Sequence, residues 1–145
     1  MTEQILVVEP EETIRQIVVS LLSTAGYKCA GAKSGNDAVS MLASGQVFDL
    51  VLSSLMMVNL DGMGLLGRIK DKYPDVPLIM MSEVTDVSVV LRAIRSGAYD
   101  FLVKPFEREL LLRTVSRALE DRRLKLENRA YVKRLESLVK SLDEN

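Results

Sequence analysis

Histidine is absent from this chain of 145 residues, and cysteine occurs once, as Cys29. Without histidine, the chain lacks a common general base for activating a serine hydroxyl. A single cysteine cannot form an internal disulfide, and this usage is typical of a reducing compartment, so we expect a cytoplasmic protein. The apolar neighbours of Cys29 favour a buried thiol over a reactive one.

Long apolar runs and an excess of one charge are also missing. No apolar run approaches the ~18 residues of a membrane-spanning helix, and no signal peptide opens the chain, so we expect no membrane partner. The 19 basic and 20 acidic residues give a net charge of -1, which provides no overall attraction to nucleic acid. Because no basic recognition helix is evident, we expect no direct nucleic-acid binding; Arg122, Arg123 and Lys125 fit a solvated helix face.

Short apolar runs alternate with helical patterns along the first 106 residues. The expected strands are Ile5–Val8, Tyr27–Ala32, Leu50–Ser53, Leu78–Met81 and Phe101–Val103. The expected helices are Glu11–Ala25, Asn36–Ala43, Met63–Lys72 and Val84–Ser96. Because three of the strands are continuously apolar and helices separate them, we predict an α/β fold with a doubly wound, five-stranded parallel sheet. The methionines Met56, Met57, Met63, Met80 and Met81 are expected to fill its core.

The end of the chain has a different pattern. From Glu107 to about Leu142 it contains no glycine or proline. A continuous helix of this span would be roughly 50 Å long at 1.5 Å per residue, longer than a small domain is wide. We therefore predict a globular domain over residues 1–121 and an extended helix, a coiled coil or linker, over residues 122–145.

Apolar side chains in this extension follow a heptad spacing. The predicted seam consists of Leu124, Asn128, Tyr131, Leu135, Leu138 and Leu142. A single asparagine at a core position, such as Asn128, favours a two-stranded, in-register coiled coil. We predict a homodimer through this helix. A lone amphipathic helix or a flexible linker remains the alternative, because fewer than three heptads are marginal and Val132 and Val139 widen the stripe.

Four motifs resemble the receiver domains of bacterial response regulators over roughly residues 3–121. Residues 5–11 read ILVVEPE, residues 48–62 read FDLVLSSLMMVNLDG, residues 78–82 read LIMMS and residues 97–106 read GAYDFLVKPF. The resemblance implies a flavodoxin-like receiver fold and a two-component, phosphorelay signal-transduction module that is not an enzyme. It also implies a sensor kinase and an effector domain or protein as partners.

The acceptor position of this family corresponds to Ser54. The resemblance implies an aspartate there, which takes a phosphoryl group, whereas a serine hydroxyl cannot form an acyl phosphate. The acidic pocket corresponds to Glu9, Pro10 and Glu11, and Pro10 stands at a position that usually supplies a magnesium ligand. Because Mg²⁺ needs several oxygen ligands, we expect weak or absent magnesium binding, and we predict no metal site and no cofactor. Pro10 also suits the first position of a helix.

Ser82, Phe101, Lys104 and Pro105 match the remaining functional positions of the family. The resemblance implies that Lys104 contacts the acceptor and the phosphoryl group, that Ser82 and Phe101 switch position, and that Pro105 follows a cis bond. Because Ser54 gives Lys104 no countercharge, we expect Glu9 to pair with Lys104. For Ser82 and Phe101, a purely structural role as strand end and core residue remains equally open.

These features together predict a pseudo-receiver, a dimerising regulatory module that works without phosphorylation and whose helix connects to an effector. One alternative is a receiver phosphorylated at a displaced acid, Asp49 or Asp61; we expect the first at the far end of its strand and the second at a helix start. The other alternative is a small-molecule-binding, flavodoxin-like domain, which would need a glycine-rich phosphate loop that the sequence lacks.

Overall fold

A five-stranded parallel sheet forms the centre of the computed structural model, which describes residues 2–144. The strands are β1 (Gln4–Val8), β2 (Lys28–Ala32), β3 (Leu50–Ser54), β4 (Leu78–Ser82) and β5 (Asp100–Val103). They lie in the order β2-β1-β3-β4-β5, and all neighbouring strands are parallel. The structure therefore confirms the predicted doubly wound α/β fold of flavodoxin-like type.

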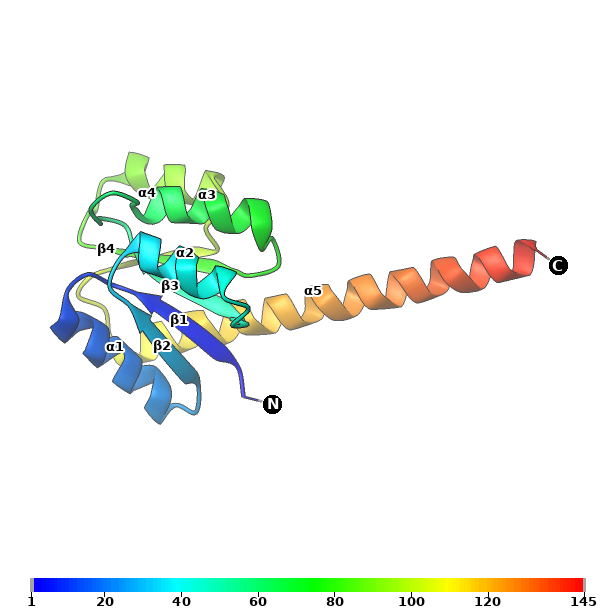
Figure 1. The fold of residues 1–145 in the computed structure, drawn as a ribbon, viewed down its shortest axis with the longest axis horizontal. Coiled ribbons are helices and arrows are strands. Elements are labelled where there is room, and N and C mark those ends of the chain that lie inside the picture. The colour runs from blue at the N-terminus through cyan, green and yellow to red at the C-terminus, as the bar shows by residue number, and fades with distance from the viewer. Residues whose placement is uncertain (1, 145) are drawn as a thin grey trace.

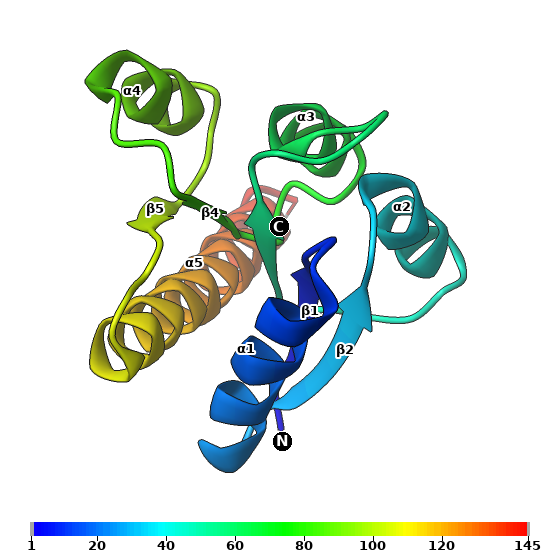
Figure 2. The same cartoon turned by 90° about the vertical axis from the view of Figure 1, so that its left-hand side faces the viewer.

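Helices cover both faces of this sheet. They are α1 (Glu12–Thr24), α2 (Gly35–Ala43), α3 (Gly62–Lys72), α4 (Val87–Arg95) and α5 (Arg108–Asp143). α1 and the first part of α5 lie on one face, and α2, α3 and α4 lie on the other (Figure 2). Successive side chains of β1 alternate between the two cores, Leu6 on the α2–α3 side and Val7 on the α1–α5 side. Burial on both faces explains why the strands are apolar throughout.

α5 continues far beyond the globular body as one helix of 36 residues (Figure 1). Its buried residues lie in its first third and are Leu111, Thr114, Val115, Ala118 and Leu119. The helix passes residue 121 without a break, so the predicted division there concerns packing and not secondary structure. Arg122 departs from the predicted solvated face, because it is half-buried and its Nη1 lies 3.3 Å from Asp49 Oδ1.

The predicted starts of α1, α2 and α3 are each one residue from the observed starts, and that of α4 is three residues away; α1 and α4 also differ in how the helix begins. α1 begins at Glu12 with Glu11 as its N-cap, so Pro10 lies outside the helix instead of at its first position. α4 begins at Val87, three residues later than predicted, because Asp86 Oδ1 accepts a hydrogen bond from the Ser88 amide at 2.9 Å and caps the helix there.

Candidate functional site

The carboxyl ends of the strands surround a cleft of about 380 Å³. Glu9 follows β1, Ser54 and Ser82 end β3 and β4, and Lys104 follows β5. Parallel strands bring these ends to the same edge of the sheet, which is where α/β proteins of this topology place their sites. The structure thus brings together four side chains that are far apart in the sequence.

Lys104 is held by two side chains in this cleft. Its ammonium forms an ion pair with Glu9 Oε1 and donates a hydrogen bond to Ser54 Oγ at 3.3 Å. The Glu9 side chain is 4% exposed and that of Lys104 13%, so the pair is largely removed from water. The predicted pairing of Glu9 with Lys104 is therefore present in the structure.

The remaining polar atoms around Glu9 are also engaged. Its Oε2 accepts a hydrogen bond from the Glu11 amide at 3.1 Å, and its carbonyl oxygen accepts one from Arg15 Nη1 at 2.8 Å. No sequence pattern predicts the Arg15 contact, because it forms only when the side chain of this helix residue turns back toward the end of β1. The Glu11 amide and the Lys104 ammonium thus each engage one carboxylate oxygen of Glu9.

The donor set does not fit a magnesium ion. Mg²⁺ prefers near-octahedral oxygen ligands and is usually held by one or two carboxylates with water and phosphate. Here Pro10 offers no side-chain oxygen, Ser54 offers a neutral hydroxyl, and Glu9 is neutralised by Lys104. The described residues also contain no group of three or more His, Cys, Asp or Glu side chains arranged to hold a metal ion.

Pro10 and Glu11 lie at the exposed rim of the cleft. Glu11 contributes its backbone amide to Glu9, while its side chain makes no capping hydrogen bond to α1. Met56 also lies on this rim and is 71% exposed, so the prediction that it fills the core is wrong. It belongs to the loop after β3, in which Asn59 adopts a positive φ of 71°, and this loop turns the chain toward α3.

The predicted switch residues are both in place. Ser82 is 3% exposed, and its Oγ accepts a hydrogen bond from the Val84 amide at 3.0 Å. Phe101 is partly buried against the core between the sheet and α2–α4. The peptide bond between Lys104 and Pro105 is cis, as the motif implied. Whether Ser82 and Phe101 change position stays a prediction.

The two alternative acids have other roles. Asp49 precedes β3, at the opposite end of the strand from Ser54; its Oδ2 accepts a hydrogen bond from the Gln4 amide at 2.8 Å and its Oδ1 pairs with Arg122. Asp61 is the N-cap of α3, where Oδ1 accepts a hydrogen bond from the Gly64 amide at 2.8 Å. Neither carboxylate lines the cleft around Ser54.

The predicted dimer seam lies on the projecting part of α5. All six of its residues, Leu124, Asn128, Tyr131, Leu135, Leu138 and Leu142, are exposed in the single chain. Leu124 and Asn128 differ from the others because they also line a cleft against the globular body. An exposed apolar stripe of this length is consistent with a helix partner, and the homodimer stays a prediction.

Comparison with known proteins agrees with the motifs. The family model of the response regulator receiver domain matches residues 5–116. This chain belongs to the response regulator receiver family. It is a signalling domain and not an enzyme, and the sheet order and the alternating helices are those of a receiver, to which this chain adds a long C-terminal helix. No helix within residues 2–144 combines the length and the apolar character needed to cross a membrane.

Two regulators illustrate the sequence similarity. The C4-dicarboxylate transport transcriptional regulatory protein DctD of Pseudomonas aeruginosa is 40% identical over 129 residues, which cover 87% of this chain and 27% of that protein. The DNA-binding transcriptional regulator NtrC of Salmonella typhimurium is 34% identical over 113 residues, which cover 78% of this chain and 24% of that protein. The receiver thus spans about a quarter of the length of these relatives.

Solved structures agree in fold. NtrX from Brucella abortus in complex with ADP superposes with a TM-score of 0.83 at 36% identity, covering 88% of this chain and 29% of that one. The isolated receiver domain of the same protein gives a TM-score of 0.75 at 36% identity, covering 80% of this chain and 98% of that one.

Proposed function

We propose that this receiver regulates its partner without an acyl phosphate at the acceptor position. The observation that carries the proposal is the ion pair between Glu9 and Lys104, with Ser54 as the second contact of the ammonium. In this arrangement the protein itself supplies the negative charge next to Lys104. The positive charge of Lys104 is therefore balanced without a phosphoryl group or a magnesium ion.

Energetic considerations support this proposal. A phosphoryl group arriving at Ser54 would place its negative charge next to the buried carboxylate of Glu9. Among residues 2–144, Lys104 is the one basic side chain that lines the cleft. Ser54 is 4% exposed, and the chain has no histidine to accept its proton. The displaced acids are a weaker alternative, because Asp49 lies at the other end of β3 and Asp61 caps α3.

The projecting part of α5 provides a surface along which two chains can assemble. α5 carries an apolar heptad stripe beyond the globular body, and we infer that two chains pair along it in parallel. The two receiver bodies would then lie at the same end of the seam. Relatives named transcriptional regulators are several times longer than this chain, which supports a role for the paired helices as a connector to paired effectors.

Incubation with acetyl phosphate and magnesium tests the first part. The wild-type chain should show no added phosphoryl group in its intact mass, and a hydroxylamine-labile adduct would contradict the proposal. The positive control is the triple variant Glu9→Asp, Pro10→Asp and Ser54→Asp, which restores three carboxylates at the matching positions. We expect this variant to gain a hydroxylamine-labile adduct under the same conditions.

The single variant Ser54→Asp separates the two defects of the cleft. It supplies an acceptor carboxylate but leaves Pro10 in the pocket, so we expect much less adduct than in the triple variant. An adduct on the wild type that mapped to Asp49 or Asp61 would favour the alternative of a displaced acceptor.

A further inference from the structure

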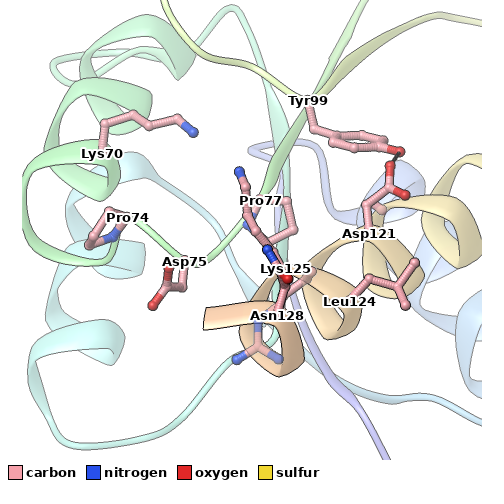
Figure 3. A pocket seen from close by; sticks show the side chains of 11 residues that line it. Lys70, Pro74, Asp75, Pro77, Tyr99, Asp121, Leu124, Lys125 and Asn128 are labelled. Carbon is pink, nitrogen blue, oxygen red and sulfur yellow. Dashed lines mark hydrogen bonds between the residues drawn. The ribbon is translucent and has the colours of Figure 1, made fainter. Parts of the chain in front are cut away.

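Figure 3 shows a second cleft, of about 530 Å³. Pro77 and Tyr99 in its lining precede β4 and β5, so it lies at the opposite edge of the sheet from Ser54, which ends β3. Its walls come from four places: the end of α3 with Lys70, the loop before β4 with Pro74 and Pro77, Tyr99 just before β5, and α5 with Lys125. The family motifs assign no role to these residues. The volume falls within the range of small-molecule sites, about 300–1,000 Å³.

The two acids of this cleft already have donors. Asp75 accepts two hydrogen bonds from Arg129, at 2.9 and 3.0 Å, which hold the pKa of its carboxyl below the ordinary range. Asp121 accepts a hydrogen bond from the Tyr99 hydroxyl. Burial and the contact with Asp121 raise the pKa of Tyr99 to about 12, so this hydroxyl stays a donor near neutral pH.

The bases of the cleft, in contrast, are incompletely paired. Within residues 2–144, neither Lys70 nor Lys125 has a carboxylate at ion-pair distance. Their side chains extend toward each other from α3 and α5 (Figure 3). Arg122 uses Nη1 for Asp49, and its Nε is buried without a hydrogen-bond partner. Two like charges that converge in one cleft favour an acceptor with negative charge between them.

Gly97 helps to hold one of these bases in place. It has a positive φ of 112°, and a Cβ atom there would lie 2.6 Å from Lys70 Cε. The missing side chain therefore leaves room for the aliphatic part of Lys70 to pass over the turn before β5 and to reach the cleft.

We propose that this cleft binds the phosphate group of a small phosphate-bearing molecule. A tetrahedral phosphate presents oxygens in several directions and can accept from Lys70 and Lys125 at once. The apolar prolines of the α3–β4 loop provide a surface for the rest of such a molecule. This inference does not depend on the absence of phosphorylation at Ser54, which lies at the other edge of the sheet.

Titration of the full chain with inorganic phosphate and with phenyl phosphate, followed by amide NMR at constant ionic strength, tests the proposal. We expect saturable shifts at the end of α3, in residues 73–77 and around residues 122–128. Lys70→Ala and Lys125→Ala should each weaken binding about tenfold, the effect of one lost charge-assisted hydrogen bond. Lys133→Ala, which removes the same charge from the exposed part of α5, should change the affinity less than about twofold.

The two probes distinguish the sources of the phosphate. Equal affinities would identify the free phosphate ion as the ligand, and tighter binding of phenyl phosphate would identify a phosphomonoester. Unsaturable shifts, shifts centred on Lys104, or equal weakening by Lys133→Ala would each overturn the proposal. Circular dichroism of every variant confirms that a loss of binding does not come from a loss of fold.

Discussion

The carboxylate of Glu9 connects three parts of the chain. It pairs with Lys104 after β5, accepts from the Glu11 amide before α1, and is itself attached to the end of β1. A buried charge that loses its partner is costly, whereas a neutral amide in place of Glu9 would keep the shape of the side chain. The contribution of the pair can therefore be isolated by one substitution.

Glu9→Gln should lower the free energy of unfolding by about 1–3 kcal/mol, because it leaves the Lys104 ammonium without a countercharge. Urea denaturation measures the change. Glu83→Gln is the matched control, since Glu83 lines the same cleft but is exposed, and we expect a change within about 0.5 kcal/mol. An unchanged midpoint for Glu9→Gln would mean that Lys104 is adequately solvated and that the pair is unimportant.

The contribution of Tyr99 to the stability of the fold should depend on pH. Burial, together with the hydrogen bond to Asp121, raises its pKa to about 12, from an unfolded value of about 10. The folded state therefore retains the proton longer than the unfolded state does. The stability that Tyr99 contributes should be fully present below about pH 10 and lost as the pH rises toward about 12.

Comparison with Tyr99→Phe isolates this effect, because the other three tyrosines are the same in both proteins. The wild type should be the more stable protein at about pH 8, and its advantage in urea denaturation should shrink at about pH 11. An advantage that stayed constant over this range would show that the hydroxyl of Tyr99 ionises normally in the folded protein.

At the scale of elements, the position of α3 against β3 depends on Gly62. This first residue of α3 lies so close to the strand that an added Cβ would be 2.6 Å from both the Ser54 carbonyl oxygen and Met80 Sδ. The contact with the backbone of β3 cannot be relieved by a side-chain rotation. The start of α3 and the end of the strand that carries Ser54 are therefore packed as one unit.

Gly62→Ala should lower the free energy of unfolding by about 1–3 kcal/mol, the usual cost of overpacking. Gly67→Ala is the control within the same helix, because a Cβ there meets nothing within 4 Å. It should raise stability by about 0.5–1 kcal/mol through the helix propensity of alanine. If both variants were stabilised equally, the close approach at Gly62 would not constrain the fold.

α5 is the element whose function can be separated from the fold. Its core contacts end at Leu119, and beyond that point its described contacts with the body include the partly buried pair Arg122–Asp49 and the exposed pair Arg129–Asp75. An exposed ion pair contributes about 0–1 kcal/mol. Removal of the residues after Arg123 should therefore leave a folded receiver with a similar unfolding temperature.

Analytical ultracentrifugation of the full chain, this truncation and Asn128→Leu tests the proposed seam. The full chain should be a dimer at tens of micromolar and the truncation a monomer. Asn128→Leu should associate more tightly but form higher oligomers, because the asparagine that specifies two strands is lost. A monomeric full chain would contradict the coiled-coil proposal.

At the scale of the whole molecule, the sequence predicted the fold well because burial on both sheet faces requires continuously apolar strands. The cleft was predictable from the parallel order of these strands, because their carboxyl ends meet at one edge of the sheet. The residues that follow or end a strand there are Glu9, Ser54, Ser82 and Lys104. Two predictions failed for local reasons. The start of α4 was predicted too early, because the cap at Asp86 and not the apolar pattern sets where the helix begins. Met56 was predicted in the core, because hydrophobic periodicity does not distinguish an exposed loop residue from a buried one. The cleft beside α5 was not predictable, because it forms only where α3 and α5 approach each other.

Beryllofluoride titration with magnesium, followed by amide NMR, shows whether the cleft around Ser54 can hold a phosphoryl group. Beryllofluoride mimics a phosphoryl group only where an acceptor carboxylate and a bound metal ion are both present. We expect no saturable shifts around residues 54, 82, 101 and 104 of the wild type, and clear saturable shifts there in the triple variant that restores the three aspartates. Saturable, magnesium-dependent shifts at these positions of the wild type would contradict this expectation.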